Sequence, residues 1–134
     1  MLERTRLKPT EPHEDAGHLR LIRKLPCLAC GAEPAEAAHV RYSDHARGRI
    51  NPGMGRRPPD RDTVPLCPKC HRMGKRCQHD GNERIWWEQH HVNPHDVATA
   101  LHQASITARA RKLDATATVE LLRAIVRKAW RGMK

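Results

Sequence analysis

The chain has 134 residues, enough for one compact domain with an appended segment but too few for two ordinary domains, so a large multidomain enzyme is excluded. Hydrophobic residues make up 38% and Phe is absent, so we expect a small apolar core that needs other reinforcement. The formal net charge of +10 favours a polyanionic partner such as nucleic acid, although a basic chain that merely stays soluble has the same balance.

No run of apolar residues approaches the length of a membrane span. Basic side chains occur within residues 1–12, but no apolar stretch follows them as a secretory signal would require. We therefore expect a soluble, cytoplasmic protein without a membrane partner.

The N-terminal part of the sequence predicts an arm followed by a short helix. Residues 1–14 are polar and contain two prolines, which indicates a flexible basic arm. Asp15 can cap a helix that Pro26 ends. The apolar edge of this helix consists of Leu19, Ile22 and Leu25.

Two short strands are predicted on either side of a long loop. Residues 35–42 form the first candidate strand, and residues 63–66 form the second, at a sheet edge because of its proline. The connecting residues 43–62 combine glycine, proline and arginine, and a connector this long in a small domain is usually functional or disordered. We prefer a phosphate-contacting loop, with a solvated linker as the alternative.

Helices are predicted over the rest of the chain. A segment interrupted near Gly74 and Gly81 resumes over residues 83–90, and Asn93 followed by proline opens another helix. The last helix, residues 115–131, has an apolar face and a basic face that is either solvated or a second DNA-contacting surface. The expected units are the arm 1–14, a core over 15–92 and a helical C-terminal extension over 93–134.

Four cysteines form two pairs, each with two residues between its members. Each pair can place two sulfurs on one metal from a single turn, and together they complete a tetrahedral zinc site. Zinc would offset the thiolate charge and close the loop between the pairs, which reinforces a small core. A redox dithiol, or disulfides in a secreted chain, explains two matched pairs less well. The predicted zinc ligands are Cys27, Cys30, Cys67 and Cys70, and Cys77 is left over.

Three histidines are tied to the cysteine pairs by position. His39 lies on the first predicted strand, and His71 directly follows the fourth cysteine. Zinc would draw these two rings toward one place, which indicates chemistry, although a single histidine is more often structural. His79 follows in the same region, and the remaining histidines are assigned to the surface or to packing.

Three segments stand together in this sequence: Cys27-x2-Cys30, Ala38-His39-Val40 and Asp62-Thr63-Val64-Pro65-Leu66-Cys67-x2-Cys70-His71. They resemble the zinc-stapled HNH endonucleases, whose ββα-metal motif is a two-stranded hairpin and a helix around one catalytic divalent ion. Gly53-Met54-Gly55, Pro58-Pro59-Asp60-Arg61 and the segment from Gln78 to Trp87 are similar to a phage and prophage branch that includes the Ref-like recombination-enhancing nucleases. The resemblance implies an α+β fold with a zinc-stapled, treble-clef-like ββα-metal core, flanking helices and a helical extension.

The resemblance also implies roles for individual residues. His39 falls at the general base, which takes a proton from the attacking water. Asp62 falls at the motif's middle asparagine, where a side-chain hydrogen bond to the hairpin loop would keep the histidine strand in register. His71 matches a ligand of a catalytic divalent ion, Mg²⁺ or another metal. His79 is the best candidate for the next ligand, because Lys75 stands where that ligand is expected.

Many relatives carry a further metal ligand just before the base, where this sequence has Ala38. The ion would then be held by the two histidines, water and substrate phosphate, or by a loop side chain. The loop candidates are Asp44, His45 and Asp60.

The expected function is a metal-dependent HNH endonuclease, a nickase or double-strand cutter of low sequence specificity, phage- or prophage-derived and active in the bacterial cytoplasm. A catalytically weak or inactive zinc-stapled DNA-binding module acting in phage recombination or packaging is the main alternative. An adaptor that binds phage or recombination proteins through its C-terminal helices is a third interpretation. The predicted DNA contacts are Arg41, Arg47, Arg49, Arg56, Arg57, Arg61, Lys69 and Arg72.

Overall fold

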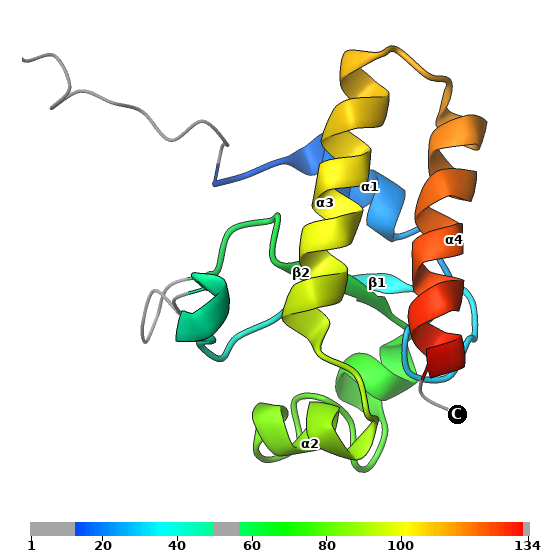
Figure 1. The fold of residues 1–134 in the computed structure, drawn as a ribbon. Helices are drawn as coiled ribbons and strands as arrows, with labels where there is room; N and C mark the ends of the chain where they lie inside the picture. The colour runs from blue at the N-terminus through cyan, green and yellow to red at the C-terminus, as the bar shows by residue number, and fades with distance from the viewer. Residues whose placement is uncertain (1–12, 50–56, 133–134) are drawn as a thin grey trace, which may run out of the picture.

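A two-stranded antiparallel sheet lies at the centre of the fold (Figure 1). The computed structural model describes residues 13–49 and 57–132. Strand β1 (Glu36–His39) pairs with β2 (Thr63–Leu66) in a register that sets Ala38 opposite Val64 and His39 opposite Thr63. The second strand has the predicted bounds, whereas the first is shorter than residues 35–42. The expected α+β class is confirmed.

The short N-terminal helix α1 (Ala16–Ile22) begins where the sequence predicts. Asp15 is its N-cap, and the side chain accepts a hydrogen bond from the His18 amide at 3.1 Å. Ile22 and Leu25 are fully buried in the core. A preceding segment is also ordered against the fold, because the Asp60 amide donates to the His13 carbonyl at 2.8 Å. The described part of the predicted arm is therefore attached to the core.

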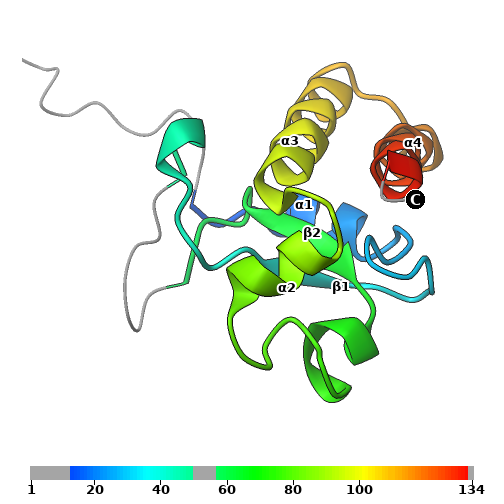
Figure 2. The same ribbon diagram turned by 60° about the horizontal axis from the view of Figure 1, so that its bottom comes forward.

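Two long helices, α3 (Pro94–Ala110) and α4 (Ala115–Gly132), run side by side (Figures 1 and 2). Asn93 caps α3 as predicted, accepting from the amides of the second and third helical residues. Leu101 on α3 and Leu122 on α4 are fully buried in the same cluster as Val64 and Trp87. The predicted C-terminal extension thus shares one hydrophobic core with the sheet. No helix in the described ranges combines the length and apolar character needed to cross a membrane.

The segment after β2 forms a single π-helical turn, η3 (Lys69–Met73), followed by helix α2 (Glu83–Gln89). In Figure 1 these elements lie at the opposite end of the molecule from the turn that joins α3 and α4. The predicted interruptions at Gly74 and Gly81 are confirmed. Gly81 has a φ of 97°, in the left-handed region that favours glycine. A Cβ at Gly74, the C-cap of η3, would lie 2.7 Å from the Lys69 carbonyl oxygen, so this position requires glycine.

Candidate functional site

The four predicted zinc ligands form one cluster. Their sulfur atoms all lie within 4.8 Å of one another, and Cys30 Sγ is 3.7 Å from Cys67 Sγ. Sulfurs bound at about 2.3 Å to a tetrahedral zinc ion would be about 3.8 Å apart, so the spacing fits zinc. Within residues 13–49 and 57–132, no other three potential metal ligands come this close together. The predicted gathering of these four cysteines is therefore confirmed.

Local backbone geometry positions the first cysteine pair against the sheet. Gly31 has a φ of 81°, and its amide donates to the Cys27 carbonyl at 2.8 Å, which closes a tight turn. The Leu28 amide in this turn donates to the Pro65 carbonyl on β2 at 2.8 Å. The second pair follows β2 directly, so the strand brings the two pairs to one place.

The chemistry of the cluster favours a bound cation. Burial raises the pKa of the Cys27 and Cys70 thiols, because a thiolate loses its hydration there. Four adjoining thiolates would also repel one another, and a zinc ion offsets both costs. Cys77 is buried but lies outside the cluster. The cluster can thus hold a metal that cross-links the two halves of the core.

His39, the predicted base, hydrogen-bonds to Asp60. His39 is the last residue of β1, and its Nε2 lies 2.9 Å from Asp60 Oδ1. The histidine side chain is 10% exposed and the aspartate side chain 2% exposed. Sequence reasoning placed Asp60 only among possible metal ligands, because nothing in a single sequence pairs two residues from different ends of a long loop.

Asp60 is held by two further hydrogen bonds, one to its side chain and one to its main chain. The Asp15 amide donates to its Oδ2 at 2.8 Å, and Thr63 Oγ1 donates to its carbonyl oxygen at 2.8 Å. Burial alone would raise the pKa of Asp60, but the hydrogen bonds from Asp15 and His39, with the positive charge of Arg57, outweigh it and hold the pKa below its ordinary value. The carboxylate is therefore ionised at neutral pH.

The electrostatics of His39 suit a proton acceptor. Burial lowers the pKa of His39 below its ordinary value, and the hydrogen bond to Asp60 opposes this shift only in part. The ring is therefore neutral at pH 7. A neutral imidazole can take a proton, which is the state that a general base requires.

Asp62 contacts the histidine strand through its main chain, and not through its side chain as the resemblance would imply. Its main-chain oxygen accepts from the Val40 amide at 2.8 Å and continues the ladder beyond the end of β1. Its carboxylate Oδ1 lies 3.5 Å from Arg49 Nη1, is buried, and has no hydrogen-bond partner among the described residues. The Asp62 main chain thus helps to hold the register of the histidine strand. The side chain contacts the loop through an ion pair with Arg49 in place of the expected hydrogen bond.

His71 and His79 lie together, as predicted for two ligands of one ion. Their rings are edge to face with centroids 4.7 Å apart. His71 Nδ1 lies 2.7 Å from Glu36 Oε1, which leaves Nε2 as the nitrogen available to a metal. Arg72 Nη2 lies 2.7 Å from Glu36 Oε2, and this ion pair, more than the hydrogen bond to His71, lowers the pKa of Glu36 to about 2. Sequence reasoning missed this carboxylate.

The three predicted catalytic imidazoles do not form one ligand set. Glu36 is the first residue of β1 and His39 is the last, so the Cα atoms of these two residues are about 10 Å apart at the usual rise of a strand. His71 contacts Glu36 and therefore lies at the other end of β1 from His39. His39 was predicted as the base and not as a ligand, and the three rings do not meet at metal-ligand distance, because in the described ranges only the four cysteines come that close together. His39 instead has its own carboxylate partner.

A half-buried glutamate, Glu83, also missed by sequence reasoning, organises the surface between the histidines. Glu83 Oε1 accepts from the Arg41 amide at 3.0 Å, and its Oε2 accepts from Gln78 Nε2 at 2.8 Å and from Trp87 Nε1 at 3.0 Å. Gln78 Nε2 also lies 3.3 Å from the His39 carbonyl oxygen. An open hollow of about 590 Å³ at this region is lined by Arg41, Gln78, His79 and Arg84 as well as by Glu83.

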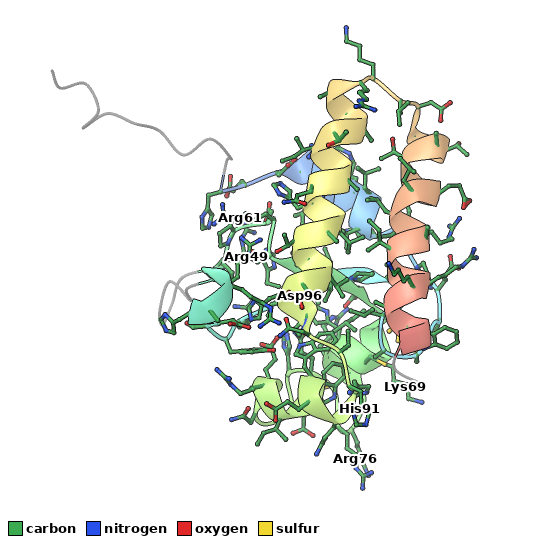
Figure 3. All side chains as sticks on the ribbon, viewed as in Figure 1. Arg49, Arg61, Lys69, Arg76, His91 and Asp96 are labelled. Atoms are coloured by element: carbon green, nitrogen blue, oxygen red, sulfur yellow. The ribbon has the colours of Figure 1, made fainter. Side chains whose placement is uncertain are left out.

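Several arginines predicted to contact DNA also anchor the loop. Arg47 Nε lies 2.6 Å from Asp96 Oδ1, and Arg49 donates to Thr99 Oγ1 on α3. The Arg49 side chain is only 16% exposed. Figure 3 shows Arg49 and Asp96 near the N-terminal half of α3.

The other predicted DNA contacts are more exposed or engage acidic partners at the surface. Arg57 lies 3.3 Å from Glu14, Arg61 lies 3.9 Å from Asp62, and Arg72 pairs with Glu36. Arg41 and Lys69 are exposed, and Figure 3 places Lys69 well away from Arg49. Arg56 lies outside the described residues.

Comparisons of the chain with protein-family models, with curated proteins and with solved structures found no match.

Proposed function

We propose that this protein is a metal-dependent DNA endonuclease of the HNH type, with low sequence specificity, that hydrolyses phosphodiester bonds by nicking or double-strand cleavage. The observation that carries the proposal is the neutral, partly buried His39 bonded to the ionised Asp60 at the end of a strand joined to the cysteine cluster. A histidine in this setting can serve as a general base at physiological pH.

His39 would take a proton from the water that attacks phosphorus. Its exposed fraction of 10% limits the approach of bulk water while leaving an edge accessible to substrate. The surrounding cations favour a phosphate at this edge, since the positive charges of Arg57 and Arg41 both act on the ring. These side chains can position a phosphodiester without reading its bases.

The cysteine cluster supports the proposal as a structural centre. It joins the turn before β1 to the segment after β2, so a bound zinc ion would hold the strand that carries His39. Four thiolates leave no open coordination position, which is typical of structural rather than catalytic zinc sites.

A second divalent ion would be held by His71 and His79. Imidazole donors suit Ni²⁺ or Zn²⁺ better than Mg²⁺, which prefers oxygen ligands, and Ala38 offers no donor atom. Such an ion, when bound, supplies Lewis-acid stabilisation of negative charge on the phosphate and the leaving oxygen. Glu36 Oε1 accepts a hydrogen bond from His71 Nδ1 and so fixes the orientation of the ring, as carboxylates beside metal-binding histidines commonly do.

A zinc-stapled DNA-binding module without nuclease activity is the second candidate. Ala38 and the separation of His39 from the histidine pair favour it, because the residues present supply few ligands for a catalytic ion. This module would act on DNA in phage recombination or packaging. The two candidates share the cysteine cluster and the cationic surface but differ in the part they give to His39.

A plasmid-nicking assay separates the candidates. Zinc-loaded wild type is incubated with supercoiled DNA and Mg²⁺, Mn²⁺ or Ni²⁺ at one salt concentration, beside His39→Asn. We expect the variant to nick about 100-fold or more slowly while its DNA affinity stays the same. His91→Asn is the matched control, because His91 is exposed and its φ of 58° suits asparagine. Equal nicking by wild type and His39→Asn would remove the proposed base.

A further inference from the structure

We propose that Asp60 is the positioning residue for the base, holding His39 with its proton on Nε2 so that Nδ1 is the nitrogen that receives the proton from water. This assignment rests on the proposed function. This part is distinct from the one that the resemblance implies for Asp62, which is to keep the histidine strand in register, because Asp60 contacts the ring of His39 itself.

The protonation of His39 follows from its partner. An ionised carboxylate can only accept hydrogen bonds, so the 2.9 Å contact with Asp60 Oδ1 requires that Nε2 donates. A neutral imidazole carries one N–H, and Nδ1 therefore keeps its lone pair. The same contact fixes the plane of the ring, which a base needs to meet one substrate proton reproducibly.

Asp60 is itself immobilised. Its side chain is 2% exposed, and its second oxygen, Oδ2, accepts from the Asp15 amide at 2.8 Å. Asp15 in turn receives two hydrogen bonds from Arg109 on α3, each of 2.8 Å. A continuous set of contacts thus runs from α3 through the start of α1 to the ring of His39. The base is held by the helical part of the fold as well as by its strand.

Asp62 does not fill this position. Its buried Oδ1 faces Arg49, and only its main-chain oxygen contacts the strand extension at Val40. Asp60, by contrast, contacts the reacting side chain directly and has both carboxylate oxygens engaged.

The test uses Asp60→Asn, which keeps an oxygen for the Asp15 amide. Its NH₂ group then faces His39, so Nε2 must accept and the proton must move to Nδ1, where it blocks the proposed base. We expect nicking to fall about 100-fold or more, with unchanged DNA affinity. Nitrogen NMR of histidine-labelled, zinc-loaded protein reports the tautomer independently: Nε2–H in the wild type and Nδ1–H in the variant.

Asp114→Asn is the matched control. Asp114 caps α4 through a 2.7 Å hydrogen bond from the Ala117 amide, and asparagine caps equally well, so the His39 tautomer and nicking should stay as in the wild type.

A wild-type His39 protonated on Nδ1 would overturn the proposal even if Asp60→Asn failed to fold. Wild-type nicking rates in a folded Asp60→Asn would also overturn it. Absence of nicking by the wild type with every metal would overturn the proposed function itself, and with it the catalytic part of Asp60.

Discussion

Arg109, near the end of α3, holds Asp15 with two parallel hydrogen bonds: Nη1 to Oδ1 and Nη2 to Oδ2, each 2.8 Å. The hydrogen bond from Arg109 is the main reason that the pKa of Asp15 falls to about 2. Asp15 also caps α1 and presents its amide to Asp60. A single ion pair therefore links two helices to the side chain that contacts His39.

Replacing this guanidinium should cost stability. We expect Arg109→Gln to lower the free energy of unfolding by about 1 kcal/mol at pH 7, since the pair is partly exposed and its strength is screened by solvent. Urea unfolding of the zinc-loaded proteins measures the difference. Arg111, two residues further along the chain, is exposed. The free energy of unfolding of Arg111→Gln should therefore stay within about 0.5 kcal/mol of that of the wild type. Equal losses in both variants would show that the ion pair contributes nothing specific.

The buried His18 makes the fold sensitive to mild acid. Its side chain is fully buried, neither ring nitrogen has a hydrogen-bond partner among the described residues, and its ring meets that of His102 edge to face. Burial, and then the charge of His102, lower the pKa of His18 from 6.5 to about 4. Asp15 and Asp60 oppose this shift, and Arg109 adds to it.

A histidine whose pKa is lower in the folded state contributes stability that is complete above pH 6.5 and is lost as the pH falls toward 4. We expect the wild type to lose about 2 kcal/mol between pH 7.5 and pH 5 from this residue alone. His18→Phe cannot titrate and should lack this part of the loss. Denaturant unfolding of both proteins across this range, with zinc held constant, gives the difference. Parallel pH curves would contradict the assignment.

The elements that depend on local pattern were predictable. Paired cysteines at matched spacing, the proline-containing second strand and the caps Asp15 and Asn93 act over a few residues, and the structure confirms them. The HNH resemblance and the nuclease function remain predictions.

The side-chain partners at the candidate site were not predictable. Asp60 meets His39 because the long loop returns to the end of β1, and nothing in composition or periodicity sets that return. Glu36 and Glu83 likewise have the pattern of ordinary surface carboxylates in the sequence, and their partners, His71 on η3 for Glu36 and Gln78 for Glu83, are set only by the fold. Charge patterning also could not show that Arg49 would be largely buried.

Removing one zinc ligand should unfold the core. We expect Cys67→Ser to lose bound zinc and to aggregate or unfold, because the metal supplies the cross-link between the turn before β1 and the segment after β2. Cys77→Ser is the matched control: it makes the same chemical change at a buried thiol outside the cluster, and zinc should stay at one ion per chain. Elemental analysis with circular dichroism measures both effects. A folded Cys67→Ser with full zinc would contradict the structural role of the site.

Two cations from the predicted DNA-contacting set should behave differently. Arg49 is largely buried, bonded to Thr99 and paired with Asp62, so Arg49→Met should lower the free energy of unfolding by about 1–3 kcal/mol. Lys69 is exposed, so Lys69→Met should leave stability within about 0.5 kcal/mol of the wild type. If Lys69 contacts a phosphate, its loss should reduce the slope of log affinity against log salt by about 1.

Fluorescence anisotropy with a short duplex, read at several salt concentrations beside urea unfolding, separates these effects. The structure assigns Arg49 to holding the loop against α3, so its variant should bind with a nearly unchanged salt slope wherever it stays folded. The opposite result, a stable Arg49→Met with a reduced slope, would mean that Arg49 leaves its carboxylate to meet DNA. The loop would then have to open on binding, because Asp62 and Thr99 enclose the guanidinium in the free protein.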